Sequence, residues 1–321
     1  MKWSKTEIEI LNQYTRTMKS VRDICYELDN AGFMRTYKSV TRKIESMGWT
    51  RPTDLSDLTV LPKILLFDIE TTPMPVWVWD FGKQYVPPTN LVKDEDNKQR
   101  VWHVLSWAAK WLYDDNVMSD IVTPKESINR DDSRVLNSIW KILDEADIVI
   151  AHNGDRFDLR KLNARFILND MPPPSPYKSI DTLKIARKEF AFSSNKQDFL
   201  TKTFGLAEKL KTDFQLWIDC MNGDKKALDN MLNYNERDVV GLEQVYLKLR
   251  PYIKNHPNLG VLMDENVCPS CGSKSIKASN ATYFTSSNEF PVYRCGSCKT
   301  PYIRSKTSIG ANKTELRSVA R

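Results

Sequence analysis

The sequence lacks any apolar run close to the roughly 20 residues that are needed to span a bilayer. A typical apolar run, Ile64–Phe67, has only the length of a β-strand. The first residues, Met1–Lys5, lead into a polar helical pattern and not into the apolar core of a signal peptide. The sequence also lacks an internal repeat, which argues against a repeat architecture. We therefore expect a cytoplasmic protein.

Cysteine is scarce, and its placement along the chain is informative. Cys25 and Cys220 are isolated, whereas the other four of the six cysteines form two close pairs near the C-terminus. In a cytoplasmic protein, such pairs indicate a metal site before they indicate disulfides. The 321 residues are 41% hydrophobic, which excludes a disordered chain and suits two or three domains with a sizeable core.

The net charge of +6 is unevenly distributed. Residues 1–50 carry a net charge of +3 and residues 266–321 carry +7, which leaves −4 for the part between them. An acidic middle with basic ends is what a metal-binding nuclease core with nucleic-acid-binding ends would show. Ordinary variation of surface charge would give the same pattern.

The first fifty residues predict three short helices, near Lys5–Tyr14, Val21–Leu28 and Thr36–Met47. In the third helix we expect Val40, Ile44 and Met47 to face inward. Asn30-Ala31-Gly32 breaks the helical pattern between the second and third of these helices.

The start of the third helix is basic. Arg35, Lys38 and Arg42 lie about one turn apart on one face. A short helix, a turn and a basic helix form a helix-turn-helix candidate. The segment resembles the small Myb-like or resolvase-like modules, and this resemblance implies that the three basic residues contact DNA. A plain three-helix bundle that binds protein or merely packs is the alternative.

From residue 63 onward, strand and helix signals alternate. Strands are predicted at Lys63–Ile69, Val104–Leu112, Val117–Val122 and Asp147–Ala151. Helices are predicted at Arg134–Ala146 and Arg156–Asn169, and helical patterns dominate residues 181–253. This order predicts an α/β layer fold. Residues 71–100 have no clear period and predict a long loop near the site.

Three groups of polar residues stand where elements begin or end. Asp68 and Glu70 close an apolar strand, and side chains two residues apart on a strand point the same way. Placing two ionised carboxylates side by side costs free energy unless a cation binds them. Taken alone, Asp68 and Glu70 could equally be the charged end of a strand that lies in solvent.

The second and third groups lie on helices. The stretch from Asn153 through Phe157 to Asp158 runs from the end of a buried strand into the first turn of a helix. Tyr234 and Asp238 are four residues apart, and hence on one face of a helix. A carboxylate beside a phenol can bind a metal ion while the hydroxyl group orients the attacking water. Several carboxylates that converge on one point are what metal-dependent phosphodiester hydrolysis needs.

The order and spacing of the three groups resemble the DEDD superfamily of 3′→5′ exonucleases, which is DnaQ-like and RNase H-like. Tyr234 resembles its tyrosine branch, which includes the proofreading domains of family B DNA polymerases and stand-alone phage or prophage exonucleases. The histidine branch would place His at position 233, where this sequence has Asn233.

This resemblance implies an RNase H-like mixed sheet flanked by helices, and a mechanism. Two Mg²⁺ or Mn²⁺ ions would be held by four carboxylates: those of Asp68, Glu70, Asp158 and Asp238. Tyr234 would position the water, whereas Asn153 and Phe157 would support the substrate strand. Nucleoside monophosphates would be released, with DNA the favoured substrate and a DNA polymerase among the possible replication or repair partners. The implied setting is a bacterial or phage-infected cell, near the nucleoid.

The paired cysteines have the spacing of a zinc ribbon. Two CxxC knuckles, separated by a stretch in which residues 282–285 and 290–293 predict a hairpin, supply the ligands Cys268, Cys271, Cys295 and Cys298. Four thiolates suit one tetrahedral Zn²⁺ and leave no open position, so we expect a structural zinc ion. Two disulfides are the alternative that the compartment disfavours.

We therefore predict five segments: a helix-turn-helix domain over 1–50, a linker over 51–62, an exonuclease domain over 63–255, a zinc ribbon over 264–304 and a basic tail over 305–321. The competing hypotheses are a non-catalytic DNA-binding or regulatory protein, and a ribonuclease or RNase H-like endonuclease. The presence of all four acidic residues and of Tyr234 favours the enzyme.

Overall fold

The computed structural model describes residues 3–15, 21–47, 62–205, 212–263, 266–285, 289–304 and 316–318. The chain divides into two compact units, Met1–Leu61 and Pro62–Arg321. The predicted linker falls, except for Pro62, outside the described residues. None of the described helices combines the length and the apolar character that crossing a membrane requires.

The N-terminal unit contains three helices: α1 (Lys5–Thr15), α2 (Val21–Asn30) and α3 (Tyr37–Ser46). Their buried side chains form a small core, with Leu11, Ile24, Leu28, Val40 and Ile44 among its members. The hydroxyl group of Thr36 accepts a hydrogen bond from the backbone N–H of Ser39 and so caps α3. Our expectation that Met47 faces inward is wrong, because Met47 lies at the C-cap of α3 and is 37% exposed.

Arg35, which we predicted to contact DNA, has a partner within the N-terminal unit. Its Nε donates a 2.6 Å hydrogen bond to the carboxylate of Glu7, and only 10% of the Arg35 side chain is exposed. Glu7 also forms a capping box with Ser4 at the start of α1. Arg35 therefore joins the segment before α3 to α1. Lys38 and Arg42, by contrast, are exposed.

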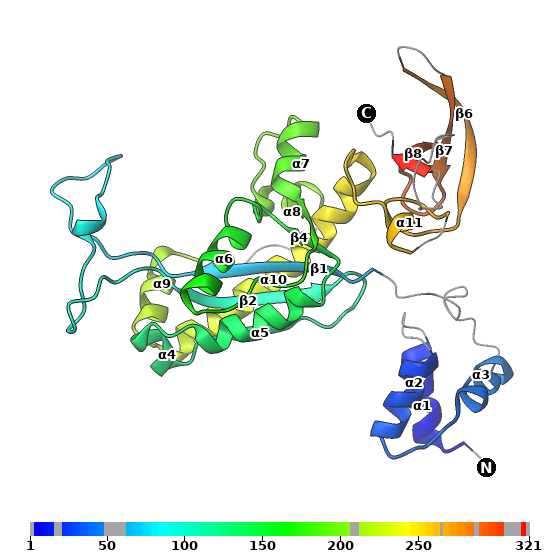
Figure 1. Ribbon diagram of the computed structural model, residues 1–321, viewed down its shortest axis with the longest axis horizontal. Helices are drawn as coiled ribbons and strands as arrows, with labels where there is room; N and C mark the ends of the chain where they lie inside the picture. The colour runs from blue at the N-terminus through cyan, green and yellow to red at the C-terminus, as the bar shows by residue number, and fades with distance from the viewer. Residues whose placement is uncertain are drawn as a thin grey trace. The chain divides into compact units, whose positions relative to one another are not determined.

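The second unit is built on a five-stranded sheet in the order β3-β2-β1-β4-β5 (Figure 1). The strands are β1 (Ile64–Thr71), β2 (Val104–Trp111), β3 (Met118–Ile121), β4 (Ile148–Ala151) and β5 (Lys178–Asp181). β1 runs antiparallel to β2 and parallel to β4, so the sheet is mixed. This arrangement confirms the predicted α/β fold with a mixed sheet.

Seven α-helices of the described residues accompany this sheet: α4 (Pro124–Asn129), α5 (Ser133–Asp144), α6 (Asp158–Leu168), α7 (Thr182–Glu189), α8 (Gln197–Thr203), α9 (Phe214–Met221) and α10 (Lys225–Leu249). On β2, Ser106 bonds to a residue of α10, whereas the indole N–H of Trp107 donates to Ser138 on α5. Neighbouring strand residues point to opposite faces, so α5 and α10 cover opposite faces of the sheet. Figure 1 shows α5 in front of β2 and α10 behind β1.

Trp107 belongs to the core, where it is only 3% exposed. Trp111 is partly buried against the same core. Trp77 and Trp79 are exposed by 70% and 100%. They lie between β1 and β2, in the segment that we predicted as a long loop.

The C-terminal part contains a short helix, α11 (Leu259–Leu262), and a second sheet in the order β6-β7-β8-β9. Its strands are β6 (Ile276–Phe284), β7 (Glu289–Cys295), β8 (Pro301–Arg304) and β9 (Leu316–Ser318). The predicted hairpin is present, with longer strands than expected. The predicted basic tail includes β9, which pairs with β8. The rest of that tail lies outside the described residues.

The ion pair between Glu7 and Arg35 predicts a pH dependence of the N-terminal unit. The hydrogen bond from Arg35 lowers the pKa of Glu7 from 4.5 to about 2. A carboxyl group whose pKa is lower in the folded state stabilises that state above the unfolded pKa, and the stabilisation is lost as the pH falls through the folded pKa. We expect the Glu7 carboxyl to titrate near pH 2 in an NMR titration of the unaltered chain. In the Arg35→Leu variant, the same carboxyl should titrate at higher pH. Titration of Glu7 above pH 4 in the unaltered chain would contradict the ion pair.

Candidate active site

Asp68 and Glu70 are held at the end of the central strand. Leu66 and Phe67 are fully buried, and the burial of β1 gives way to partial exposure at Asp68 and Glu70, with Ile69 buried between them. The apolar residues of β1 thus fix the backbone inside the sheet. The strand's alternation then places both carboxylates on one face.

Helix α10 brings the third carboxylate to the same place. It begins at the N-cap residue Asp224, whose side chain accepts from the N–H of Ala227, and it crosses β1, β2 and β3. Tyr234 and Asp238 are both 7% exposed. Carboxylate oxygens of Asp68, Glu70 and Asp238 all lie within 4.8 Å of one another. Hard oxygen donors at this spacing can hold a divalent metal ion.

Asp158 lies beside this cluster, and its carboxylate binds a backbone N–H group of β1. Its carboxylate accepts a 3.1 Å hydrogen bond from the backbone N–H of Ile69, between the two acidic residues of β1. Burial raises the pKa of Asp158 to about 7, and the nearby Asp181 carboxylate acts in the same direction. Three of the four predicted metal ligands therefore meet in one group, and Asp158 borders it.

Asn235 is a residue of the site that the sequence analysis missed. It is fully buried on α10, and its side-chain amide donates a 2.7 Å hydrogen bond to Asp68. The amide oxygen of Asn235 accepts a 3.0 Å hydrogen bond from the hydroxyl group of Ser106 on β2. This relay fixes the orientation of the Asp68 carboxylate. Its only signal in the sequence is the i, i+3 spacing of Asn235 and Asp238 on a helix.

A cleft of about 940 Å³ opens over the acidic residues. The predicted substrate residues Asn153 and Phe157 line it, together with Tyr234. Basic side chains from α7, α8 and the segment between them also line the cleft: Arg187, Lys196 and Lys202. A cleft with acidic and basic sides can bind a metal ion and a phosphate backbone together. The basic residues were not predicted from the sequence.

Helix α8 also supports α10. The side-chain amide of Gln197 donates a 2.7 Å hydrogen bond to the backbone carbonyl of Asp238. A Cβ atom at Gly241 would lie 3.2 Å from a methyl carbon of Thr201. Glycine at this position therefore allows α8 to approach α10 closely enough for Gln197 to reach its partner.

Three other polar residues near the cleft have structural partners. His152 contacts Thr182 at 2.8 Å and the backbone carbonyl of Asn195 at 2.9 Å through its two ring nitrogens. Asp155 pairs with Lys184 at 2.7 Å, so it does not cap α6. Asp181 caps α7 and also accepts from the backbone N–H of Asn153.

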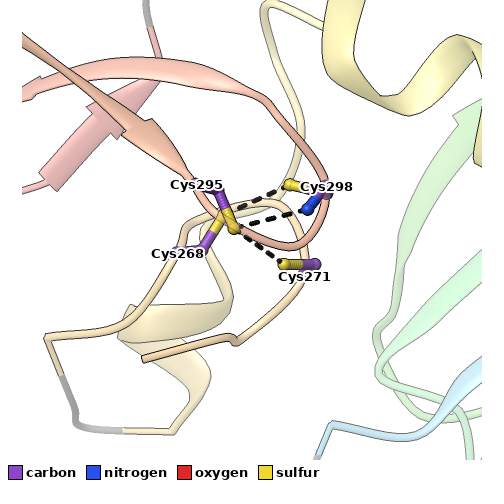
Figure 2. Close-up of side chains that lie close together, drawn as sticks. All are labelled: Cys268, Cys271, Cys295 and Cys298. Atoms are coloured by element: carbon purple, nitrogen blue, oxygen red, sulfur yellow. Dashed lines mark hydrogen bonds between the residues drawn. The ribbon is translucent and has the colours of Figure 1, made fainter. Parts of the chain in front are cut away.

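The four cysteines of the two knuckles form a second cluster (Figure 2). The sulfur atoms of Cys268 and Cys298 are 3.5 Å apart, and those of Cys271 and Cys295 are 3.6 Å apart. Neighbouring thiolates around a tetrahedral metal ion with bonds of about 2.3 Å would be about 3.8 Å apart, whereas a disulfide needs about 2.05 Å. The donor set therefore fits a metal ion.

The relay through Asn235 predicts an effect on metal binding. Loss of a side chain that orients a metal ligand typically costs about 10- to 100-fold in affinity. We therefore expect Asn235→Ala to weaken Mn²⁺ binding, measured by calorimetry, by about that factor. Asn233→Ala is the matched control, because Asn233 is exposed on the same helix. Equal Mn²⁺ affinity of both variants, with unchanged thermal unfolding, would show that Asn235 does not position Asp68.

Comparison with known proteins places this site in a family. No curated protein matches the sequence. Among solved structures, the chain is similar to the family B DNA polymerase from the hyperthermophilic archaeon Pyrobaculum calidifontis, with 17% identity and a TM-score of 0.44. That match covers 60% of this chain and 25% of the polymerase chain. Residues 65–250, which include the sheet, the acidic cluster and α10, match the RNase H superfamily, and the protein therefore belongs to this superfamily of nucleases.

Proposed function

We propose that the protein is a two-metal-ion 3′→5′ exonuclease that removes nucleoside monophosphates from nucleic acid, with DNA as the favoured substrate. The observation that carries this proposal is the convergence of the Asp68, Glu70 and Asp238 carboxylates, whose oxygens lie within 4.8 Å of one another at the cleft. The 3′→5′ polarity and the preference for DNA rest on the resemblance of the three motifs to the tyrosine branch of the DEDD exonucleases.

The donor set of the cleft fits Mg²⁺ or Mn²⁺. Asp68, Glu70 and Asp238 supply hard carboxylate oxygens, and Asp158 is the fourth carboxylate that borders them. When bound there, the ions would activate water and stabilise the negative charge on the leaving oxygen. Four acidic side chains in one cleft repel one another, and bound divalent cations would offset this repulsion.

The side chains of the protein supply binding and orientation. Tyr234 lies one helical turn before Asp238, and its ring packs edge-on against Trp217 at a centroid distance of 6.1 Å. A phenol held in this way can orient the attacking water. Arg187, Lys196 and Lys202 neutralise backbone phosphates of the substrate, and Asn153 and Phe157 support its terminal nucleotides.

We further propose that the N-terminal unit contacts duplex DNA through α3. Lys38 and Arg42 line a small cleft of about 380 Å³, together with Trp3 and Lys43. Arg35 is not included in this contact, because its side chain pairs with Glu7 and is only 10% exposed.

For the C-terminal part we propose one structural zinc ion on the four cysteines, and nucleic-acid contact by its basic residues. Lys274, Lys277, Arg294 and Lys299 belong to this part of the sequence. A DNA polymerase is the kind of protein partner that the resemblance suggests.

The exonuclease proposal predicts a ladder of products that shorten from the 3′ end. We expect the chain to trim 5′-labelled single-stranded DNA with Mg²⁺ or Mn²⁺ and to lose this activity in EDTA. Asp68→Ala should lower the rate by at least about a hundredfold, because it removes a ligand that stabilises charge in the transition state. Tyr234→Phe should lower kcat by about a hundredfold if the phenol orients the water.

Asp229→Ala is the matched control, because Asp229 is exposed on α10 and pairs only with Lys225 among the contacts described. A 3′-blocked oligonucleotide and a labelled RNA complete the comparison. Internal cleavage of the blocked substrate would establish an endonuclease, and cleavage of RNA alone would overturn the preference for DNA.

The proposed DNA contact of α3 predicts a change in salt dependence. Each phosphate neutralised by a basic side chain contributes about 0.9 to the slope of log K against log salt. The Lys38→Ala/Arg42→Ala variant should therefore bind duplex DNA more weakly in EDTA, with a slope reduced by up to about 2. Lys5→Ala, at an exposed position of α1, is the control. An unchanged slope would exclude this face.

The cysteine cluster predicts one zinc ion per chain. Elemental analysis of the purified protein should give about one equivalent of zinc, since four thiolates form a closed tetrahedral site. Cys268→Ser/Cys298→Ser should lose this zinc, whereas Cys25→Ser should retain it, because Cys25 lies in the N-terminal helix α2. Retention of zinc in the double variant would contradict the assignment.

A further inference from the structure

The segment between β1 and β2 forms an arm, residues 72–103, that the proposed function does not use. In Figure 1 it is the cyan segment that runs beyond β1 and β2 at the left. Two hydrogen bonds of 3.0 Å fix the base of the arm. The backbone N–H of Thr72 donates to the carbonyl of His103, and the backbone N–H of His103 donates to the hydroxyl group of Thr72. Farther out, Trp77 pairs with Asn90 through a 2.9 Å backbone hydrogen bond. The arm therefore has a defined backbone path.

Four aromatic rings of the arm are open to solvent. Trp77 is 70% exposed, Trp79 100%, Phe81 99% and Tyr85 85%. Single exposed apolar side chains are ordinary on protein surfaces, whereas several exposed aromatic rings in one segment indicate a binding surface. All four rings lie within nine residues of the chain, and Lys83 lies between them.

The arm is continuous with the active-site cleft. Its first residue follows Glu70 by two positions, so it leaves the sheet at the edge where the acidic cluster lies. On the other side of its base, the ammonium group of Lys161 lies 3.6 Å from the ring centroid of Trp102 and 5.5 Å from that of Phe157. Phe157 lines the cleft. A strip of ring, cation and ring thus connects the cleft with the base of the arm.

We propose that the arm is a stacking track for the unpaired strand of nucleic acid whose 3′ end occupies the cleft. This inference rests on the proposed nuclease function and deepens it. Every base has a π-face, so exposed aromatic rings can stack on single strands of any sequence. The continuity with the cleft favours this occupant over a protein, because a strand that enters the cleft must continue along a neighbouring surface.

The track is tested by the length dependence of binding in EDTA, where metal-dependent cleavage does not occur. The probes are fluorescent oligothymidylates of about 4 and about 20 nucleotides, and binding is followed by anisotropy; single-strand sites span about 4–16 nucleotides. The test variant is Trp79→Ser/Phe81→Ser. The matched control is Ile167→Ser/Leu168→Ser, at two positions of α6 that are 75% and 69% exposed.

Stacking on an aromatic side chain contributes about 1–3 kcal/mol per base, which corresponds to at least about fivefold for each ring. We therefore expect the arm variant to bind the longer probe at least about tenfold more weakly, and the shorter probe within about twofold of the unaltered chain. The control should bind both as the unaltered chain does. Binding of the longer probe should also quench tryptophan fluorescence less in the arm variant.

Two results would overturn the track. The first is an unchanged affinity of the arm variant for the longer probe. The second is a chain that sediments as a dimer, with the arm variant monomeric, since the rings would then cover a second copy. Absence of cleavage by the unaltered chain would contradict the exonuclease proposal but would not affect this binding test. Failure of the exonuclease proposal and failure of the stacking track are therefore distinguishable.

Discussion

Mutual repulsion among carboxylates is the constraint on which this structure depends. Asp68, Glu70 and Asp238 bring oxygens within 4.8 Å of one another, and Asp238 is largely buried. Like charges at such distances disfavour the ionised state unless cations or hydrogen-bond donors compensate. The fold provides donors, from Asn235 to Asp68 and from the backbone of Ile69 to Asp158. Carboxylate oxygens at this spacing could also hold a divalent metal ion, whose charge would offset the repulsion.

Holding these charges together requires a rigid frame, and α10 is its main member. This 25-residue helix packs on three strands and carries Tyr234, Asn235 and Asp238. Gln197 of α8 binds the backbone of α10 at Asp238, and Gly241 permits the close approach. The helix that supplies one ligand therefore also orients another, through Asn235, and positions the phenol of Tyr234. Because α8 also contributes to the basic side of the cleft, substrate contact and ligand geometry share one support.

The sequence predicted what local patterns encode, and it missed what long-range contacts create. An apolar strand that ends in Asp68 and Glu70, and a helix with Tyr234 and Asp238 on one face, can be recognised without a structure. The hydrogen bond of Asn235 to Asp68 spans 167 residues, and that to Ser106 spans 129. No local sequence pattern can therefore predict these two contacts. The pairing of Arg35 with Glu7 could not be predicted for the same reason, because 28 residues separate the two side chains. Basic residues on a helix face indicate DNA contact only when no acidic residue from another helix already pairs with them.

Anomalous diffraction from crystals soaked in Mn²⁺ would test the central claim, that the acidic cluster is a catalytic metal centre, most directly. The account predicts manganese peaks bounded by Asp68, Glu70 and Asp238, with two ions about 3.5–4 Å apart when a nucleotide is present. Asp158 should then contact one of them. Manganese absent from this cluster, in crystals whose cleft is open to solvent, would contradict the account and leave the acidic residues without a catalytic role.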